Sequence, residues 1–305
     1  MVDMGARDRF RIDGKVALVT GGGQGIGRAF ALALAEAGAG VVIADINERS
    51  GSLVAREIEG AGGSARFVRT DVTSEADVRH VVERAVDDLG RLDIAVNNAW
   101  VGGRAGGARG QPSNALDMAF DEWDFVHGLL LRACFLCCKH EAAAMVAQGG
   151  GRIINVASIS AFVANASAAY CSAKAGVVGL TRRLAAEWGG YNINVNSISP
   201  SYTLSPARRT DSVDDRALIR SLNPVGWYGR PEDLTGTLVY LASDASSFVT
   251  GQDIVVDGGH TLNVWLEPPA RHLPAPVPPE VEASSLVHDL DILGMPHDID
   301  GVVKP

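Results

Sequence analysis

The sequence predicts an α/β domain in which a doubly wound, mainly parallel sheet is flanked by helices on both faces. Short runs rich in valine and isoleucine alternate with longer stretches of helical period over roughly the first 260 residues. The short runs lack polar alternation, as expected for strands that are buried on both faces. A parallel sheet covered by helices accounts for both observations.

Seven candidate strands follow one another along the chain. Their ranges are 15–20, 40–45, 65–72, 92–99, 151–158, 193–199 and 252–259. Helical patterns fill the intervals, most clearly at 27–38, 75–90 and 173–189. Such helical crossovers connect parallel strands. Seven strands in one series fill a single domain, which we place at residues 1–264.

Two segments depart from the alternating pattern. Residues 101–116 are rich in glycine and alanine and carry little to bury, so we expect a loop there. Residues 265–305 hold eight of the thirteen prolines, which disfavour helix and central strand. We expect a proline-rich C-terminal extension or arm, which either packs on its own or a neighbouring subunit or is disordered.

Composition and charge exclude several classes of partner. The chain has 305 residues, 47% of them hydrophobic and 21% charged, and its net charge is −9. This acidic balance, without a basic patch, argues against nucleic acid and anionic membranes. The charged start lacks a secretory signal, and no apolar run reaches the roughly 20 residues of a membrane span. We expect a cytoplasmic protein that acts on a small molecule.

The four cysteines are not spaced as a disulfide framework. Cys134, Cys137 and Cys138 crowd into one apolar helical stretch, and Cys171 stands apart. Cys134, Cys137 and His140 could in principle hold zinc, but no second ligand cluster accompanies them. The pattern favours buried, reduced thiols and no metal.

The first candidate strand runs into TGGGQGIG, residues 20–27. Glycine at Gly21, Gly25 and Gly27 permits a tight turn and a close approach of backbone to ligand. Free N–H groups and the helix dipole at the following helix start favour an anion such as a pyrophosphate. We predict that this loop, with Ile26 included, binds a dinucleotide, because it follows the first strand of an alternating pattern.

Asp45 ends the second candidate strand, 20 residues after Gly25. A carboxylate at this place accepts hydrogen bonds from a ribose 2′-hydroxyl. It would repel a 2′-phosphate, and neither Gln24 nor Ile46 supplies a compensating cation. The sequence therefore favours NAD over NADP.

Tyr170 and Lys174 stand four residues apart in YCSAK, which places both on one face of a helix. A phenol has a pKa of about 10 in water and is a poor base at neutral pH. A nearby ammonium favours the phenolate and suits the tyrosine to general acid/base work. Ser158 ends a strand at the same edge of the sheet, where its hydroxyl could bond the substrate oxygen.

Four motifs at these spacings resemble the short-chain dehydrogenase/reductase family: TGGGQGIG, NNA, a serine followed by YCSAK, and VDGG. The resemblance covers about residues 12–263. It implies a Rossmann-type seven-stranded sheet and a homodimer or homotetramer formed through helices flanking that sheet. It also implies that Tyr170 is the catalytic acid/base, that Ser158 orients the substrate oxygen, and that Lys174 lowers the tyrosine pKa and binds the nicotinamide ribose.

The same resemblance implies further cofactor contacts. Asp71 and Val72 match positions that contact adenine, and Asn98 matches a residue at the cofactor. Thr203 and Ser205 fall where backbone and hydroxyl groups meet the nicotinamide carboxamide. Asn97 matches an asparagine that stabilises the sheet.

The chain departs from the family pattern at four positions. Seven residues after Trp123, Leu130 stands where similar proteins carry an asparagine that completes a proton relay through a bound water. Trp100 stands where glycine is usual, Ser201 replaces the glycine of a Pro-Gly pair, and Trp227 replaces a frequent arginine. Leucine cannot bond water, so the relay from the lysine must be rerouted or weakened.

The sequence thus predicts an NAD-dependent oxidoreductase that interconverts a secondary alcohol and a ketone. Trp100, Trp227 and Tyr202 could line an apolar pocket for a bulky substrate, or could only pack against loops. An NAD-binding sensor or assembly protein with weakened catalysis is the alternative. A sugar-nucleotide epimerase is disfavoured, because it would need another glycine spacing and a larger substrate domain.

Overall fold

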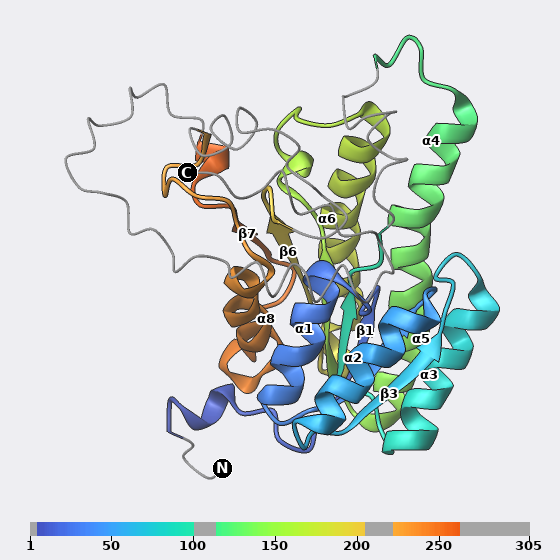
Figure 1. Cartoon of the computed structure of the whole chain (residues 1–305), viewed down its shortest axis with the longest axis vertical. Helices are drawn as coiled ribbons and strands as arrows, with labels where there is room; N and C mark the ends of the chain where they lie inside the picture. Colours follow the sequence, from blue (N-terminus) through green and yellow to red (C-terminus); the bar gives the residue numbers. More distant parts are fainter. Residues whose placement is uncertain (1–4, 101–113, 205–221, 263–305) are drawn as a thin grey trace, which may run out of the picture.

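The computed structural model describes residues 5–100, 114–204 and 222–262. Within these residues seven strands form one sheet of order β3-β2-β1-β4-β5-β6-β7, and all neighbouring pairs are parallel. Figure 1 shows the sheet with helices packed around it. The strands are β1 (Val16–Thr20), β2 (Gly40–Asp45), β3 (Ala65–Arg69), β4 (Ile94–Asn97), β5 (Gly151–Val156), β6 (Ile193–Pro200) and β7 (Asp253–Val256). The predicted Rossmann-type, doubly wound class is confirmed.

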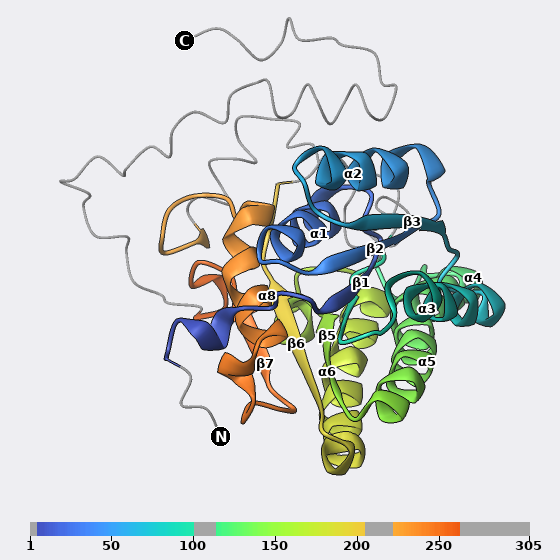
Figure 2. The same ribbon diagram turned by 90° about the horizontal axis from the view of Figure 1, so that it is seen from below.

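Helices cover both faces of the sheet, as Figure 2 shows. They are α1 (Gly25–Glu36), α2 (Glu48–Gly60), α3 (Glu75–Leu89), α4 (Phe120–His127), α5 (Ala133–Gln148), α6 (Ala168–Trp188) and α8 (Thr235–Ala242). α1, α2 and α8 lie over one core, which includes Phe30 and Leu34. α3, α5 and α6 lie over the other, which includes Met145 and Leu184. The uniformly apolar strands are buried between these two layers.

The strand order reverses at β1, which pairs with β2 on one side and β4 on the other. Doubly wound sheets bind ligands at this switch point, outside the carboxyl ends of the strands. In the register of β1 with β4, Thr20 lies opposite Asn97. The glycine loop that follows β1 therefore meets the NNA motif that follows β4.

Three of the α-helices start at an N-cap residue whose side chain accepts a backbone hydrogen bond, and each is of a residue type that favours this position. Asn47 accepts a hydrogen bond from the Ser50 N–H at the start of α2, and Ser74 accepts one from the Asp77 N–H at the start of α3. Ser167 accepts one from the Tyr170 N–H at the start of α6. These residue types satisfy N–H groups that have no partner within the helix.

The helical stretch after Trp123 is not one regular helix. α4 ends at His127, a π-helical turn spans Gly128–Arg132, and α5 continues from Ala133. A π turn inserts an extra residue and changes the faces that the flanking side chains present. Counting along an ideal helix from Trp123 therefore does not give the orientation of Leu130.

Several predictions lie outside the described residues. They concern most of the glycine-rich segment at 101–116, Ser205, and the extension at 265–305. Within the described ranges, no helix has both the length and the apolar character needed to cross a bilayer. The same ranges contain no group of three or more His, Cys, Asp or Glu side chains placed to hold a metal ion.

Candidate active site

The glycine loop packs its backbone tightly against the start of α1. Gly21 and Gly25 have φ of +62° and +55°, a region that side chains disfavour. A Cβ on Gly27 would lie 2.0 Å from the Gly21 carbonyl oxygen, so no larger residue fits there. Gln24 precedes α1 without capping it through its side chain, which leaves the first N–H groups open to an anion. The loop therefore fits a pyrophosphate.

Asn98 fastens this loop to the end of β4. Its amide nitrogen donates to the Thr20 carbonyl oxygen at 3.1 Å and to the Gly21 carbonyl oxygen at 3.2 Å. The N–H groups of Asn98 and Ala99 donate to Thr20 Oγ1 at 3.0 and 3.2 Å. The side chain of Asn98 thus holds the loop in shape, and a cofactor contact would come from the loop that it holds.

The carboxylate of Asp45 is fixed beside the glycine loop. Asp45 Oδ2 accepts a hydrogen bond from the Gly23 N–H, and Oδ1 accepts one from the Asn47 N–H, both at 2.9 Å. Glycine at position 23 permits this approach, because a Cβ there would lie 2.8 Å from Asp45 Oδ2. A negative charge is therefore held at the end of β2, next to the anion-binding loop.

Three other predicted cofactor contacts lie at the carboxyl edge of the sheet. Asp71 follows β3, and its Oδ1 accepts hydrogen bonds from the Thr73 N–H at 2.9 Å and the Thr73 hydroxyl at 2.7 Å. Val72 is buried and lines a cavity beneath the site. Thr203, after β6, donates from its hydroxyl to the Ser201 carbonyl oxygen at 3.0 Å.

Ser158 leaves β5 and caps a short 3₁₀ turn, Ile159–Ala161. Its hydroxyl oxygen accepts a hydrogen bond from the Ser160 N–H at 3.1 Å and donates to Ser160 Oγ at 3.1 Å. Ser160 Oγ donates in turn to Asn165 Oδ1 at 2.7 Å. The Ser158 hydroxyl is thus fixed in place, while its proton can rotate toward a substrate oxygen.

Tyr170 lies in the first turn of α6, partly exposed at the same edge. The ring of Trp100 meets the Tyr170 ring edge-on, with 5.0 Å between centroids and 69° between planes. Trp100 remains 38% exposed. One part of its indole therefore packs on the tyrosine while another stays open beside it.

Lys174 lies one helical turn after Tyr170, and only 6% of it is exposed. Its Nζ is 5.9 Å from the centroid of the Tyr170 ring and donates to the Val156 carbonyl oxygen at 2.7 Å. Burial lowers the pKa of Lys174 to about 8, against a smaller opposing effect of Cys134. The helical spacing thus brings the amine beside the phenol, and apolar surroundings make that amine easier to deprotonate.

Comparisons with known proteins show the family to which the chain belongs. Residues 21–261 match the family described as enoyl-(acyl carrier protein) reductase. A cis-4-hydroxycyclohexanecarboxylate dehydrogenase of Sinomonas cyclohexanicum is 42% identical over 248 residues, which are 81% of this chain and 96% of that protein. The crystal structure of a short-chain type dehydrogenase/reductase from Mycobacterium marinum matches with a TM-score of 0.78 and 41% identity over 84% of this chain and 99% of that one. The chain belongs to the short-chain dehydrogenase/reductase family.

This membership confirms the resemblance drawn from the motifs and makes the chain an oxidoreductase. A second solved member, a gluconate 5-dehydrogenase from Burkholderia cenocepacia, is in complex with NADP and tartrate. It matches with a TM-score of 0.79 and 35% identity over 85% of this chain and all of that one. Some solved members bind NADP and others NADH, so membership alone does not select NAD.

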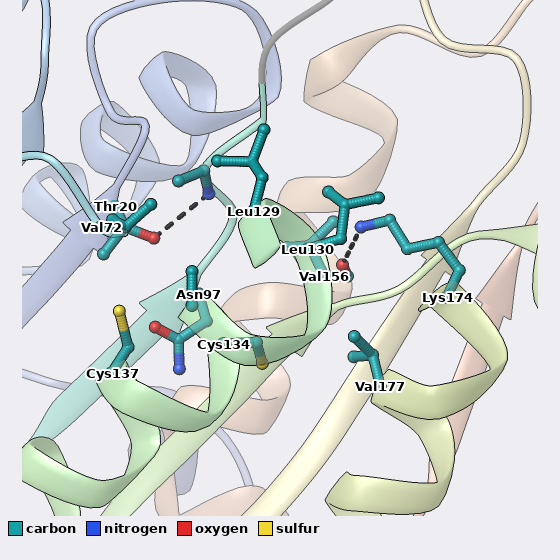
Figure 3. A pocket seen from close by; sticks show the side chains of 12 residues that line it. Thr20, Val72, Asn97, Leu129, Leu130, Cys134, Cys137, Val156, Lys174 and Val177 are labelled. Atoms are coloured by element: carbon teal, nitrogen blue, oxygen red, sulfur yellow. Dashed lines mark hydrogen bonds between the residues drawn. The ribbon is translucent and has the colours of Figure 1, made fainter. Parts of the chain in front are cut away.

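A small cavity lies beneath the site of this short-chain dehydrogenase/reductase (Figure 3). Its volume is about 20 Å³, on the scale of a single water molecule. Leu129 and Leu130 of the π turn, Cys134 of α5 and Lys174 of α6 all line it. Leu129 and Leu130 thus form a hydrocarbon wall beside the lysine, and this wall contributes to its burial.

Two features of the site were not predicted from the sequence. The contact between Trp100 and Tyr170 joins segments 70 residues apart, and no local pattern signals it. Glu141 is fully buried on α5 and accepts a hydrogen bond from the Asn97 amide at 3.0 Å. Its signal was an acidic residue inside the apolar stretch CFLCCKHEAAAMV, which is anomalous for a helix packed on a sheet.

Proposed function

We propose that this protein is an NAD-dependent oxidoreductase that interconverts a secondary alcohol and a ketone, with Tyr170 as the acid/base. The observation that carries the proposal is the buried Lys174 amine, 5.9 Å from the centroid of the Tyr170 ring. Ser158 and an anion-binding loop lie at the same edge of the sheet. Hydride chemistry on a carbon that bears oxygen needs such a proton carrier beside a nicotinamide.

The residues divide the work of the reaction. The glycine loop and the open start of α1 bind the pyrophosphate, and Asp45 accepts hydrogen bonds from the adenine ribose. A nicotinamide held by these residues would supply or accept the hydride. Ser158 donates a hydrogen bond to the substrate oxygen and orients it. In alcohol oxidation Tyr170 takes the hydroxyl proton, and in ketone reduction it returns one.

Lys174 makes the tyrosine suitable for this task. A positive charge beside the phenol favours the phenolate and lowers the tyrosine pKa. With a lysine pKa of about 8, most of the amine is charged at neutral pH. Turnover in the oxidation direction should therefore rise to a maximum near pH 8 and decline as the lysine loses its proton.

Asp45 supports NAD as the cofactor. Both of its carboxylate oxygens are held by backbone N–H groups, so the charge cannot turn away from an incoming ribose. A 2′-phosphate at this position would meet that charge at short range. We infer a KM for NAD well below that for NADP, in contrast to the NADP complex of the Burkholderia cenocepacia relative.

We infer a homodimer or homotetramer that acts on a small molecule and uses neither nucleic acid nor membrane. The acidic net charge of −9 supports this choice of partners. The cytoplasmic location expected from the sequence stays a prediction.

Replacement of Tyr170 by phenylalanine tests the proposed role of the phenol. The variant keeps the ring against Trp100 and loses the hydroxyl, so kcat for secondary alcohols should fall at least about a thousandfold. Formation of NADH from NAD is followed by absorbance, over a panel of cyclic and acyclic secondary alcohols. NAD binding, measured by calorimetry, should stay within about threefold of the wild type.

Two outcomes would contradict the proposal in different ways. Retained turnover in the Tyr170→Phe variant would remove the tyrosine from its role. Tight NAD binding by the wild type without turnover of any alcohol in the panel would favour the alternative, a sensor with weakened catalysis. Leu130 is the observation behind that alternative, because it lines the lysine cavity with hydrocarbon.

A further inference from the structure

A buried polar network lies one layer below the proposed catalytic residues. The amide nitrogen of Asn97 donates to Glu141 Oε2 and to Asn155 Oδ1, both at 3.0 Å. The Cys138 thiol also donates to Asn155 Oδ1, at 3.3 Å. The amide nitrogen of Asn155 donates in turn to Thr181 Oγ1 at 3.0 Å. Side chains alone therefore join β4, β5, α5 and α6.

The network stands directly behind the site along the chain. Each of three network residues has a neighbour in the site. Asn97 precedes Asn98 at the end of β4, Asn155 precedes Ser158 at the end of β5, and Thr181 lies two turns after Lys174 on α6. Residues that support a site from behind fix the positions of the groups in front. A displacement within the network would therefore move the glycine loop, the serine or the lysine.

Glu141 is the one acidic member of this network and is fully buried. Its Oε1 has no hydrogen-bond partner among the described residues. Burial raises the pKa of Glu141 to about 7, and the hydrogen bond from Asn97 opposes the rise. No basic side chain in the described ranges forms an ion pair with it. A charged carboxylate here would be buried without a cation, which is strongly unfavourable.

The groups that face Glu141 do not supply a compensating charge. On its own helix, the thiols of Cys137 and Cys138 lie nearby, and both are buried. Burial raises the pKa of Cys137, so its thiol stays neutral at physiological pH. From β4 the facing group is the amide of Asn97, which donates but does not titrate. Among the described residues that form this network, Glu141 is therefore the one group that changes charge near neutral pH.

We propose that Glu141, as a neutral carboxyl, is a positioning residue that orients Asn97 and thereby sets the spacing of β4, β5 and α6 behind the site. The proposal rests on the proposed function for the roles of Ser158 and Lys174. Ionisation of Glu141 places an unpaired charge within the network and loosens the contact of α5 with β4. Stability then falls as the pH rises through neutrality, and turnover falls below that of a variant whose residue 141 cannot ionise.

The stability effect has a defined pH window. The pKa of about 7 in the folded protein lies above the ordinary value of 4.5, so the folded state holds an extra proton between these values. The contribution of Glu141 is complete below about pH 4.5 and is lost as the pH rises to about 7. We compare the wild type with a variant whose residue 141 cannot ionise. Between these two pH values the unfolding equilibrium constant of the wild type should rise, relative to that of the variant, about tenfold per pH unit.

Urea unfolding at several pH values between 5 and 8 measures this effect without any reference to activity. Glu141→Gln keeps an oxygen that accepts from Asn97 and cannot ionise, so its stability should lose the part of the pH dependence that Glu141 contributes. Glu36→Gln, at the exposed end of α1, is the matched control and should follow the wild type. Parallel curves for wild type and Glu141→Gln would overturn the proposal.

The turnover of the full-length protein tests the positioning role. At pH 6, kcat for Glu141→Gln should stay within about twofold of the wild type, and at pH 8 it should exceed the wild type about threefold. Glu141→Leu removes the acceptor for Asn97 and should lower kcat at every pH. A wild-type pH profile in Glu141→Gln, or wild-type kcat in Glu141→Leu, would refute positioning. Failure of the Tyr170→Phe test would instead refute the proposed function and leave the unfolding result intact.

Discussion

Trp100 gives this site a feature that the motifs of the family do not contain. Its indole contacts the Tyr170 ring edge-on and remains partly exposed. A planar apolar surface beside the proposed acid/base favours a substrate that carries a ring or another flat apolar group next to its hydroxyl. An aromatic contact of this kind contributes about 0.5–1.5 kcal/mol beyond the area that it buries.

Replacement of Trp100 by glycine should change the choice of substrate more than the chemistry. We expect kcat/KM for cyclohexanol to fall about tenfold, because the ring loses its apolar wall, while kcat/KM for 2-butanol changes less than about twofold. Initial rates of NADH formation measure both values. Trp100→Phe, which keeps an aromatic ring, should retain most of the preference. An equal loss for both alcohols would show that Trp100 supports Tyr170 and does not select substrates.

At the scale of elements, the π turn between α4 and α5 decides what surrounds Lys174. The turn presents Leu129 and Leu130 to the cavity that the lysine also lines. π turns inside helices occur frequently at functional sites. Here the turn encloses an amine in hydrocarbon, and this enclosure helps to lower the lysine pKa to about 8.

Leu130→Asn should therefore shift the pH dependence of turnover. An amide beside the cavity reduces the desolvation of the ammonium and raises the pKa of Lys174, so the alkaline decline of kcat/KM should move up by about one pH unit. In the proposed mechanism the charged lysine is the active form, so we expect activity to extend to higher pH. Rates from pH 6 to 10 measure the shift, with Leu130→Met as a control of similar volume. Superimposable profiles would show that the leucine does not set the lysine pKa.

At the scale of the whole molecule, the α4 and α5 region carries large apolar side chains on its surface. Trp123, Phe125 and Phe135 are each more than a third exposed. Apolar side chains gathered on a surface favour contact with another protein. Because these helices flank the sheet, they fit the homodimer or homotetramer that we propose.

Light scattering should give a mass of two or four times 32.0 kDa. Phe135→Glu places a charge on the apolar surface of α5 and should lower that mass, whereas Tyr191→Glu, beyond the end of α6, should leave it unchanged. If both variants keep the mass of the oligomer, the contact between subunits lies elsewhere. A wild-type mass of one chain would refute the proposed assembly.

Local patterns predicted a large part of this protein, since the physical requirement and the residues lie together in the chain. The positive φ of Gly21 and Gly25 demands glycine, so the loop is recognisable before its shape is known. Tyr170 and Lys174 share a face because of helical geometry alone. The roles of these residues remain predictions, because only turnover can test them.

Contacts between distant segments could not be predicted in the same way. Glu141 and Asn97 are 44 residues apart, and an acidic residue in an apolar helix does not reveal its partner. The orientation of Leu130 depends on a π turn that interrupts the helical count. Both features follow from how helices pack on the sheet.

The amino-acid sequence by itself determined the alternation of strands and helices, the glycine loop, Asp45 and the pair Tyr170–Lys174, because backbone sterics and helical period act over a few residues. The tertiary structure decided how buried the lysine is, which ring lies against the tyrosine and which groups surround the buried carboxyl of Glu141. These properties arise from packing, which removes water from groups that the chain order keeps far apart.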